Sequence, residues 1–175
     1  MKIVLFGLSL AALAVLYRVI PHTSNVTPFA ALALLAVSQG FRVMSGWALF
    51  LPILVLLVSD LFLGFYPGVE FVYGGHLLAA LMGLLLTRWS MPRFVGAVGG
   101  SALIFFAVSN LGVWLMTPLY AKTWSGLVEC YVAALPFLKM SLLGDFVFAS
   151  LVFGAYRLGG LAAASKERVC EDSSL

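Results

Sequence analysis

The chain has 175 residues, of which 63% are hydrophobic and 10% charged, and its formal net charge is +3 at pH 7. A soluble domain carries about 25% charged residues, so this composition excludes an ordinary water-facing surface and indicates an integral membrane protein. The small positive excess forms no basic cluster of the kind that binds nucleic acid, so we expect no nucleic-acid partner.

Six segments are predicted as membrane-spanning helices, because a helix needs about 20 mostly apolar residues to cross a bilayer. They cover residues 2–20, 27–41, 47–66, 71–87, 94–116 and 136–158. The first is expected to be a retained helix, because Tyr17, Arg18 and Pro21 stand where a signal peptide needs a small-residue cleavage site. Residues 119–135 are more polar, and we expect a short interfacial helix there.

The predicted fold is therefore an all-α bundle of six transmembrane helices over residues 1–160, followed by a short cytoplasmic tail at 161–175. The lysines and arginines predict its orientation, because they are enriched on the cytoplasmic side. With both termini cytoplasmic, three of the ten lie outside, namely Arg18, Lys122 and Lys139. The other seven lie at cytoplasmic ends, which favours this orientation.

Most of the unusual polar residues fall towards the outer ends of these predicted spans. An ionisable side chain at the bilayer centre costs about 2.5–3.5 kcal/mol on insertion scales, so it is expected to face protein or water and to have a partner. We therefore predict one polar pocket open to the outside, with Arg18 as the counter-ion of Asp60. The predicted ligand-binding residues are Arg18, His22, Asn25, Asp60, Tyr73, His76, Asn110, Trp114 and Asp145.

Each of these residues also has a structural interpretation. In place of binding a ligand, Asp60 and Arg18 would form an ion pair that holds two helices together. Asp145 would cap a broken helix after Gly144. Asn110 would form a hydrogen bond between neighbouring helices. The outer aromatic residues suit either an interfacial belt or a stacking surface for a ligand. Two carboxylates and two histidines are workable acid–base groups, but no spacing specifies catalytic residues, so we do not predict an enzyme.

Five stretches together resemble a family of small bacterial inner-membrane proteins of unknown function. They are "IPHTSNVTPFAALAL" (20–34), "LVSDLFLGFYPGVEFVYGG" (57–75), "SNLGVWL" (109–115), "TWSGLVECYVAALPF" (123–137) and "SLLGDFVFASLVFGAY" (141–156). The resemblance covers nearly the whole chain. It implies a multi-pass protein of the bacterial inner membrane.

The layout is also similar to the substrate-binding S components of energy-coupling-factor vitamin transporters, above all the solitary cobalamin-uptake type. This resemblance implies a six-helix bundle that binds a vitamin-like solute near its outer face, with cobalamin as a candidate substrate and no required cofactor. The solitary type can ligate cobalt through a cysteine near the start of helix 4, where this chain has none, and His76 is the candidate replacement.

Partners follow from the same resemblance. Because the chain has no nucleotide-binding motif, an energising membrane subunit would have to supply energy for active uptake. Gly7 and Ala11 give the first predicted helix a small-residue face on which such a subunit would dock. The alternative is a structural or assembly protein without a transported ligand, and a membrane enzyme is a third hypothesis.

Overall fold

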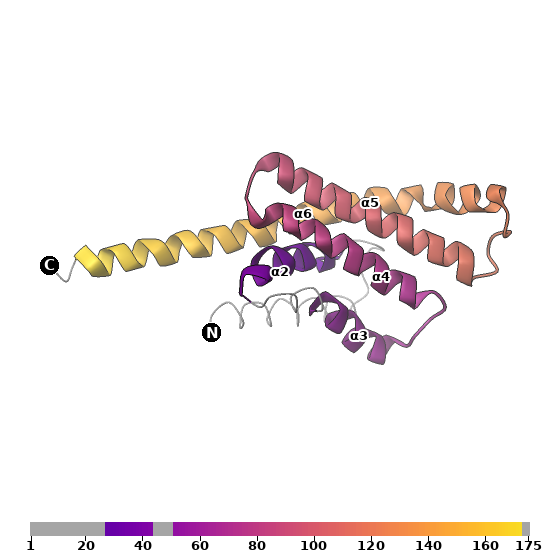
Figure 1. The fold of residues 1–175 in the computed structure, drawn as a ribbon, viewed down its shortest axis with the longest axis horizontal. Coiled ribbons are helices and arrows are strands. Elements are labelled where there is room, and N and C mark those ends of the chain that lie inside the picture. The colour runs from indigo at the N-terminus through magenta and orange to yellow at the C-terminus, as the bar shows by residue number, and fades with distance from the viewer. Residues whose placement is uncertain (1–26, 44–50, 173–175) are drawn as a thin grey trace.

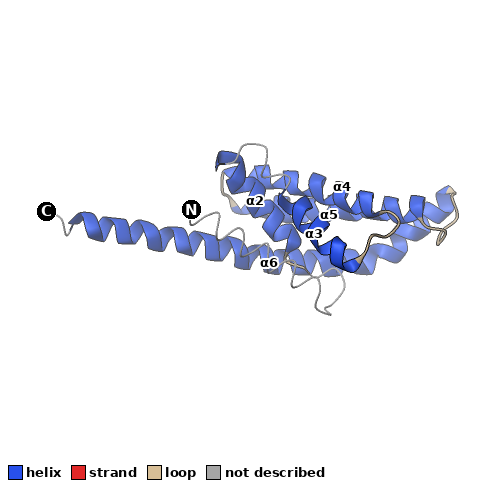
Figure 2. Cartoon of the chain, turned by 90° about the horizontal axis from the view of Figure 1, so that it is seen from below, coloured by secondary structure: helices blue, strands red, loops and turns tan. Residues whose placement is uncertain are grey.

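The computed structural model describes residues 27–43 and 51–172, and every regular element in these ranges is a helix (Figures 1 and 2). The described chain therefore confirms the predicted all-α class, while the predicted helix 2–20 lies outside the described residues. In chain order the elements are α2 (Phe29–Val43), α3 (Leu51–Leu63), α4 (Val69–Ala80), the 3₁₀-helix η2 (Leu81–Thr87) that continues α4, α5 (Met91–Met116) and α6 (Trp124–Asp172).

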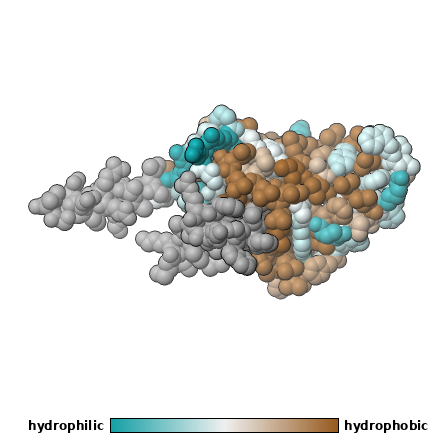
Figure 3. Space-filling view, in the orientation of Figure 1, coloured by the Kyte–Doolittle hydropathy of each residue, from teal (hydrophilic) through white to brown (hydrophobic). Residues whose placement is uncertain are grey.

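Three helical stretches in the described ranges are long and apolar enough to cross a membrane. Val69–Thr87, Met91–Met116 and Trp124–Gly159 contain 19, 26 and 36 residues. The apolar helices Phe29–Gln39 and Ile53–Leu63 are shorter. An apolar surface covers most of the middle of the bundle in Figure 3, as expected for contact with lipid. These observations indicate a membrane protein, and the count of six spans stays a prediction.

An apolar core closes one half of the bundle. It joins α2, η2, α5 and α6, and Phe94 and Phe153 meet edge to face within it, with ring centroids 6.0 Å apart. Small residues such as Ala97 and Ala149 are fully buried here and let the helices approach closely. This core holds α2, η2, α5 and α6 together near the turn between η2 and α5.

The last helix corrects the predicted boundary at Pro136. Residues 119–135 were expected to form a separate interfacial helix, but α6 runs without a break from Trp124 to Asp172, with Pro136 inside it. The Tyr131 hydroxyl donates a hydrogen bond of 2.5 Å to the Ala107 carbonyl oxygen and holds the first turns of α6 along α5. Proline is tolerated because it removes a single backbone donor in a helix that its neighbours support. The helix also continues through most of the segment predicted as a tail.

A tight turn sets the start of α4 against the end of α5. Gly64 and Gly68 have φ angles of 90° and 87°, a left-handed conformation that glycine adopts without strain. A side chain at Gly112 would meet Phe71, with its Cβ 2.4 Å from that of Phe71. The absence of a side chain at Gly112 therefore lets Phe71 seat against α5, which positions the cavity-facing side of α4.

Gly83 marks the closest approach between η2 and α2. A Cβ atom at Gly83 would lie 2.7 Å from the Leu34 carbonyl oxygen and 2.9 Å from the Val37 Cβ. We predict that Gly83→Ala lowers the melting temperature of the detergent-solubilised protein, because overpacking a fitted contact costs about 1–3 kcal/mol.

The matched control is Gly96→Ala on α5, where a Cβ atom meets no heavy atom within 4 Å. Alanine stabilises a helix more than glycine does, so this variant should melt at the same temperature as the wild type or at a slightly higher one. Equal melting temperatures for the two variants would contradict the close contact between η2 and α2.

Candidate functional site

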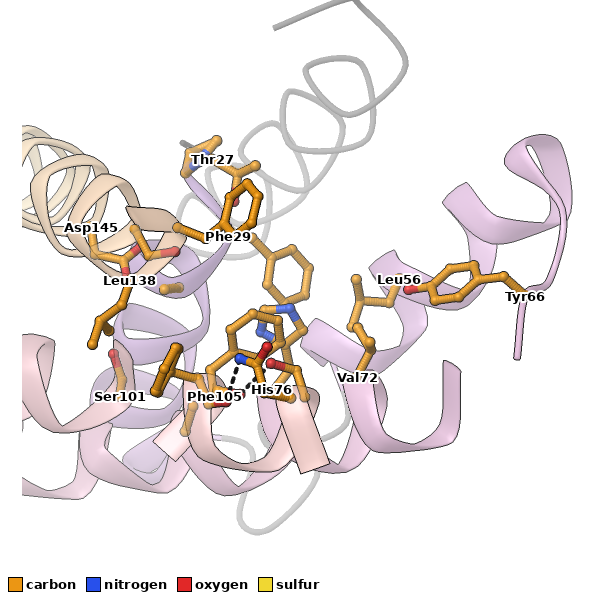
Figure 4. Close-up of a pocket in the computed structure, with 18 of the residues that line it drawn as sticks. Thr27, Phe29, Leu56, Tyr66, Val72, His76, Ser101, Phe105, Leu138 and Asp145 are labelled. Carbon is orange, nitrogen blue, oxygen red and sulfur yellow. Dashed lines mark hydrogen bonds between the residues drawn. The ribbon is translucent and has the colours of Figure 1, made fainter. Parts of the chain in front are cut away.

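A cavity of about 500 Å³ lies between the helices, towards the end of the bundle where α2 and α4 begin (Figure 4). Segments around α2, α3, α4, α5 and α6 all contribute to its wall. Several lining side chains are small, among them Ala30, Ala79, Ser101 and Ser141. Larger side chains at these positions would occupy part of the cavity.

Aromatic side chains form the middle of the cavity wall. His76 lies between two phenyl rings: its ring is stacked on Phe105 with centroids 4.1 Å apart and meets the edge of Phe29 at 4.5 Å. Phe106 and Phe137 also line the cavity. Such a wall suits the flat, apolar body of a small organic molecule.

Polar groups on α5 line the same cavity. The hydroxyl groups of Ser101 and Ser109 donate hydrogen bonds of 2.9 and 2.7 Å to the carbonyl oxygens of Val98 and Phe105 on their own helix. The Asn110 amide nitrogen donates in the same way to Phe106, at 2.8 Å. Each of these side chains donates one hydrogen bond to its own helix. Its oxygen can still accept a hydrogen bond from a ligand.

Asp145 supplies a carboxylate to the cavity wall from α6. Its side chain is only 7% exposed, yet it accepts no hydrogen bond and forms no ion pair among the residues that the structure describes. In Figure 4, Asp145 and Ser101 lie on one side of the view, Tyr66 lies on the other, and Phe29, His76 and Phe105 lie between them. The cavity therefore has an acidic end and an aromatic middle.

Asp60 is buried differently. It is 0% exposed, does not line the cavity, and accepts a hydrogen bond of 2.7 Å from the Tyr73 hydroxyl. This bond joins α3 to α4. The role of Asp60 in ligand binding therefore stays a prediction, and the contact described here is the one with Tyr73 on the neighbouring helix.

The sequence model described as "Family of unknown function (DUF6580)" matches residues 1–166. The chain belongs to the DUF6580 family. No curated protein and no solved structure matches it. Family membership assigns no activity, and the cavity and its lining residues are the features from which a function can be inferred.

The structure brings three of the nine predicted site residues of this DUF6580 chain together at the cavity: His76, Asn110 and Asp145. Asp60 and Tyr73 bond to each other and are not part of the cavity wall. The predictions for Arg18, His22 and Asn25 fall outside the described residues. Binding by any of the nine stays a prediction.

Trp114 is the remaining predicted site residue, and it stabilises the loop between α5 and α6. Its indole Nε1 donates a hydrogen bond of 2.9 Å to the Ala121 carbonyl oxygen. Lys122 donates to the carbonyl oxygens of Trp114 and Thr117 and lies 5.7 Å from the centroid of the indole ring. Trp114 does not line the cavity.

The sequence prediction missed most of the aromatic wall, formed by Phe29, Phe105, Phe106 and Phe137. Phenylalanine is common in apolar membrane helices, so these positions carry no compositional signal. No group of three or more histidine, cysteine or acidic residues that could hold a metal ion occurs in the described ranges. His76 does line the cavity, and its predicted role as a cobalt ligand stays a prediction.

We predict that Tyr73→Phe lowers the melting temperature without enlarging the cavity, because it removes only the hydroxyl that bonds to Asp60. A hydrogen bond between membrane helices contributes about 0.6 kcal/mol on average and up to about 1.7 kcal/mol. Tyr120→Phe, in the loop between α5 and α6, is the control. A Tyr73→Phe protein that melts with the wild type would show that this bond contributes nothing measurable.

Proposed function

We propose that this protein is a membrane-embedded binding protein that takes up a small, vitamin-like organic solute, in the manner of an S component. The observation that carries the proposal is the cavity of about 500 Å³ lined by five helical segments. Small-molecule sites typically measure about 300–1,000 Å³ and combine apolar walls with a few placed polar groups. Here phenyl rings supply the walls, and His76, Asn110 and Asp145 supply polar groups.

The volume bears on the size of the solute. A cavity in the lower half of the usual range suits a molecule of ordinary drug size. A complete corrinoid, with its macrocycle, side chains and nucleotide loop, is much larger, so it would have to remain partly outside. The cavity therefore favours a compact vitamin-like solute over cobalamin.

The cellular setting belongs to the same proposal. The distribution of lysine and arginine supports both termini in the cytoplasm of a bacterium, with the protein multi-pass in its inner membrane. Uptake against a gradient would need an energising membrane subunit, with the first predicted helix as its docking surface.

One observation favours a second candidate, a structural or assembly role. The hydrogen bond that the buried Asp60 carboxylate accepts from Tyr73 joins α3 to α4 and supports this role. That role explains Asp60, but it does not explain a hollow next to an acidic side chain at Asp145. A binding function accounts for both features.

Filling the cavity tests the proposed function. Ser141 lines the cavity from α6, whereas Ser150 on the same helix is exposed and does not line it. We predict that a small molecule co-purifies with the detergent-solubilised wild type and with Ser150→Phe, but is lost from Ser141→Phe. Mass spectrometry of the extracted small molecules measures this difference.

The two serine variants introduce the same side chain into the same helix, so nonspecific detergent or lipid carry-over should be equal in both. A co-purifying compound retained equally by both variants, or the absence of any compound from the wild type, would contradict the proposal. Melting curves of both variants check that each is folded.

A further inference from the structure

We propose that the cavity binds an organic cation: a compact molecule whose protonated nitrogen pairs with Asp145 and whose apolar or aromatic body lies among the phenyl rings. This inference rests on the proposed binding function and specifies the charge and hydrogen-bonding character of the solute.

The first observation is the state of the Asp145 carboxylate. More than nine-tenths of its surface is buried, it lines the cavity, and no described residue donates a hydrogen bond to it or pairs with it. Burial of a carboxylate without a partner is strongly unfavourable, whereas a paired and hydrogen-bonded carboxylate is tolerated. A cation in the cavity would supply the missing partner.

The second observation is that three polar side chains of α5 in the cavity wall, those of Ser101, Ser109 and Asn110, have oxygens that can accept hydrogen bonds. The hydrogens of the Ser101 and Ser109 hydroxyls and one hydrogen of the Asn110 amide point to carbonyl oxygens of α5. Each of these side chains keeps an oxygen that can accept a hydrogen bond, in addition to the carboxylate of Asp145. A solute that donates hydrogen bonds would pair with these acceptors and with the carboxylate of Asp145.

The third observation concerns charge and rings. No lysine or arginine of the described ranges lines the cavity, so these residues offer no cation for a carboxylate or phosphate of a solute. Phe105, Phe106, Phe29 and Phe137 all line it. Phenyl faces attract cations by about 0.5–2 kcal/mol, more in a desolvated site than at a surface. The aromatic wall and the carboxylate thus both favour a positively charged ligand.

Three probes that share an indole ring test the inference: tryptamine is a cation at neutral pH, tryptophol is neutral and indole-3-acetate is an anion. Equilibrium binding to the full chain in detergent should rank them in that order. We expect tryptamine to bind at least about tenfold more tightly than tryptophol, the preference expected when a close charge pair forms in a desolvated site. Tryptamine serves as a chemical probe of the site and is not proposed as the natural solute.

Variants at Asp145 separate a specific charge contact from general affinity for indoles. Asp145→Asn should reduce the preference for tryptamine over tryptophol to within about twofold, because the amide keeps the shape and removes the charge. Asp145→Glu should retain the preference. The control Glu129→Gln removes an exposed carboxylate from the same helix and should leave the preference unchanged.

Equal binding of the three probes, a preference for indole-3-acetate, or an unchanged preference in Asp145→Asn would overturn the inference. An absence of saturable tryptamine binding to the folded wild type would also overturn it. These results leave the proposed binding function to be decided by the co-purification of solutes with the Ser141→Phe and Ser150→Phe variants, so the two failures are distinguishable.

Discussion

Burying a carboxyl group between apolar helices is unfavourable unless a polar group pairs with it. This constraint bears on the surroundings of both Asp60 and Asp145. The chain meets it in two ways. Asp60 accepts a hydrogen bond from Tyr73 and joins α3 to α4 away from the cavity. Asp145 is directed to a hollow instead, with no partner among the described residues. The first arrangement joins two helices, and in the proposed function the second provides a partner for a solute.

The bundle has a packed core and a cavity at different places between the same helices. Around Phe94 and Phe153 the helices form a continuous core, and Gly83 brings η2 against the backbone of α2. Towards the other end, the contacts between the same helices pass through serine and alanine side chains such as Ser101 and Ala79. The packed half holds α2, η2, α5 and α6 together, and the cavity lies between helices beside it.

The sequence predicted the class and part of the site. Long apolar runs predicted helices, and carboxylates within such runs marked Asp60 and Asp145. It could not predict which of them faces the cavity, because that depends on how α3 is rotated against Tyr73. Proline also suggested a helix start at Pro136, whereas packing of the preceding turns along α5 kept one helix. Phe105 was missed because it resembles any lipid-facing phenylalanine.

The most direct measurement of the central claim is a crystal structure of the full chain grown from a lipidic mesophase. The account predicts an enclosed space between α2, α4, α5 and α6, with non-protein density that extends from Asp145 to the rings around His76. Helices packed together without that space, with Asp145 bonded to a neighbouring side chain, would contradict it. That result would assign both carboxylates to helix packing and leave no site for a solute.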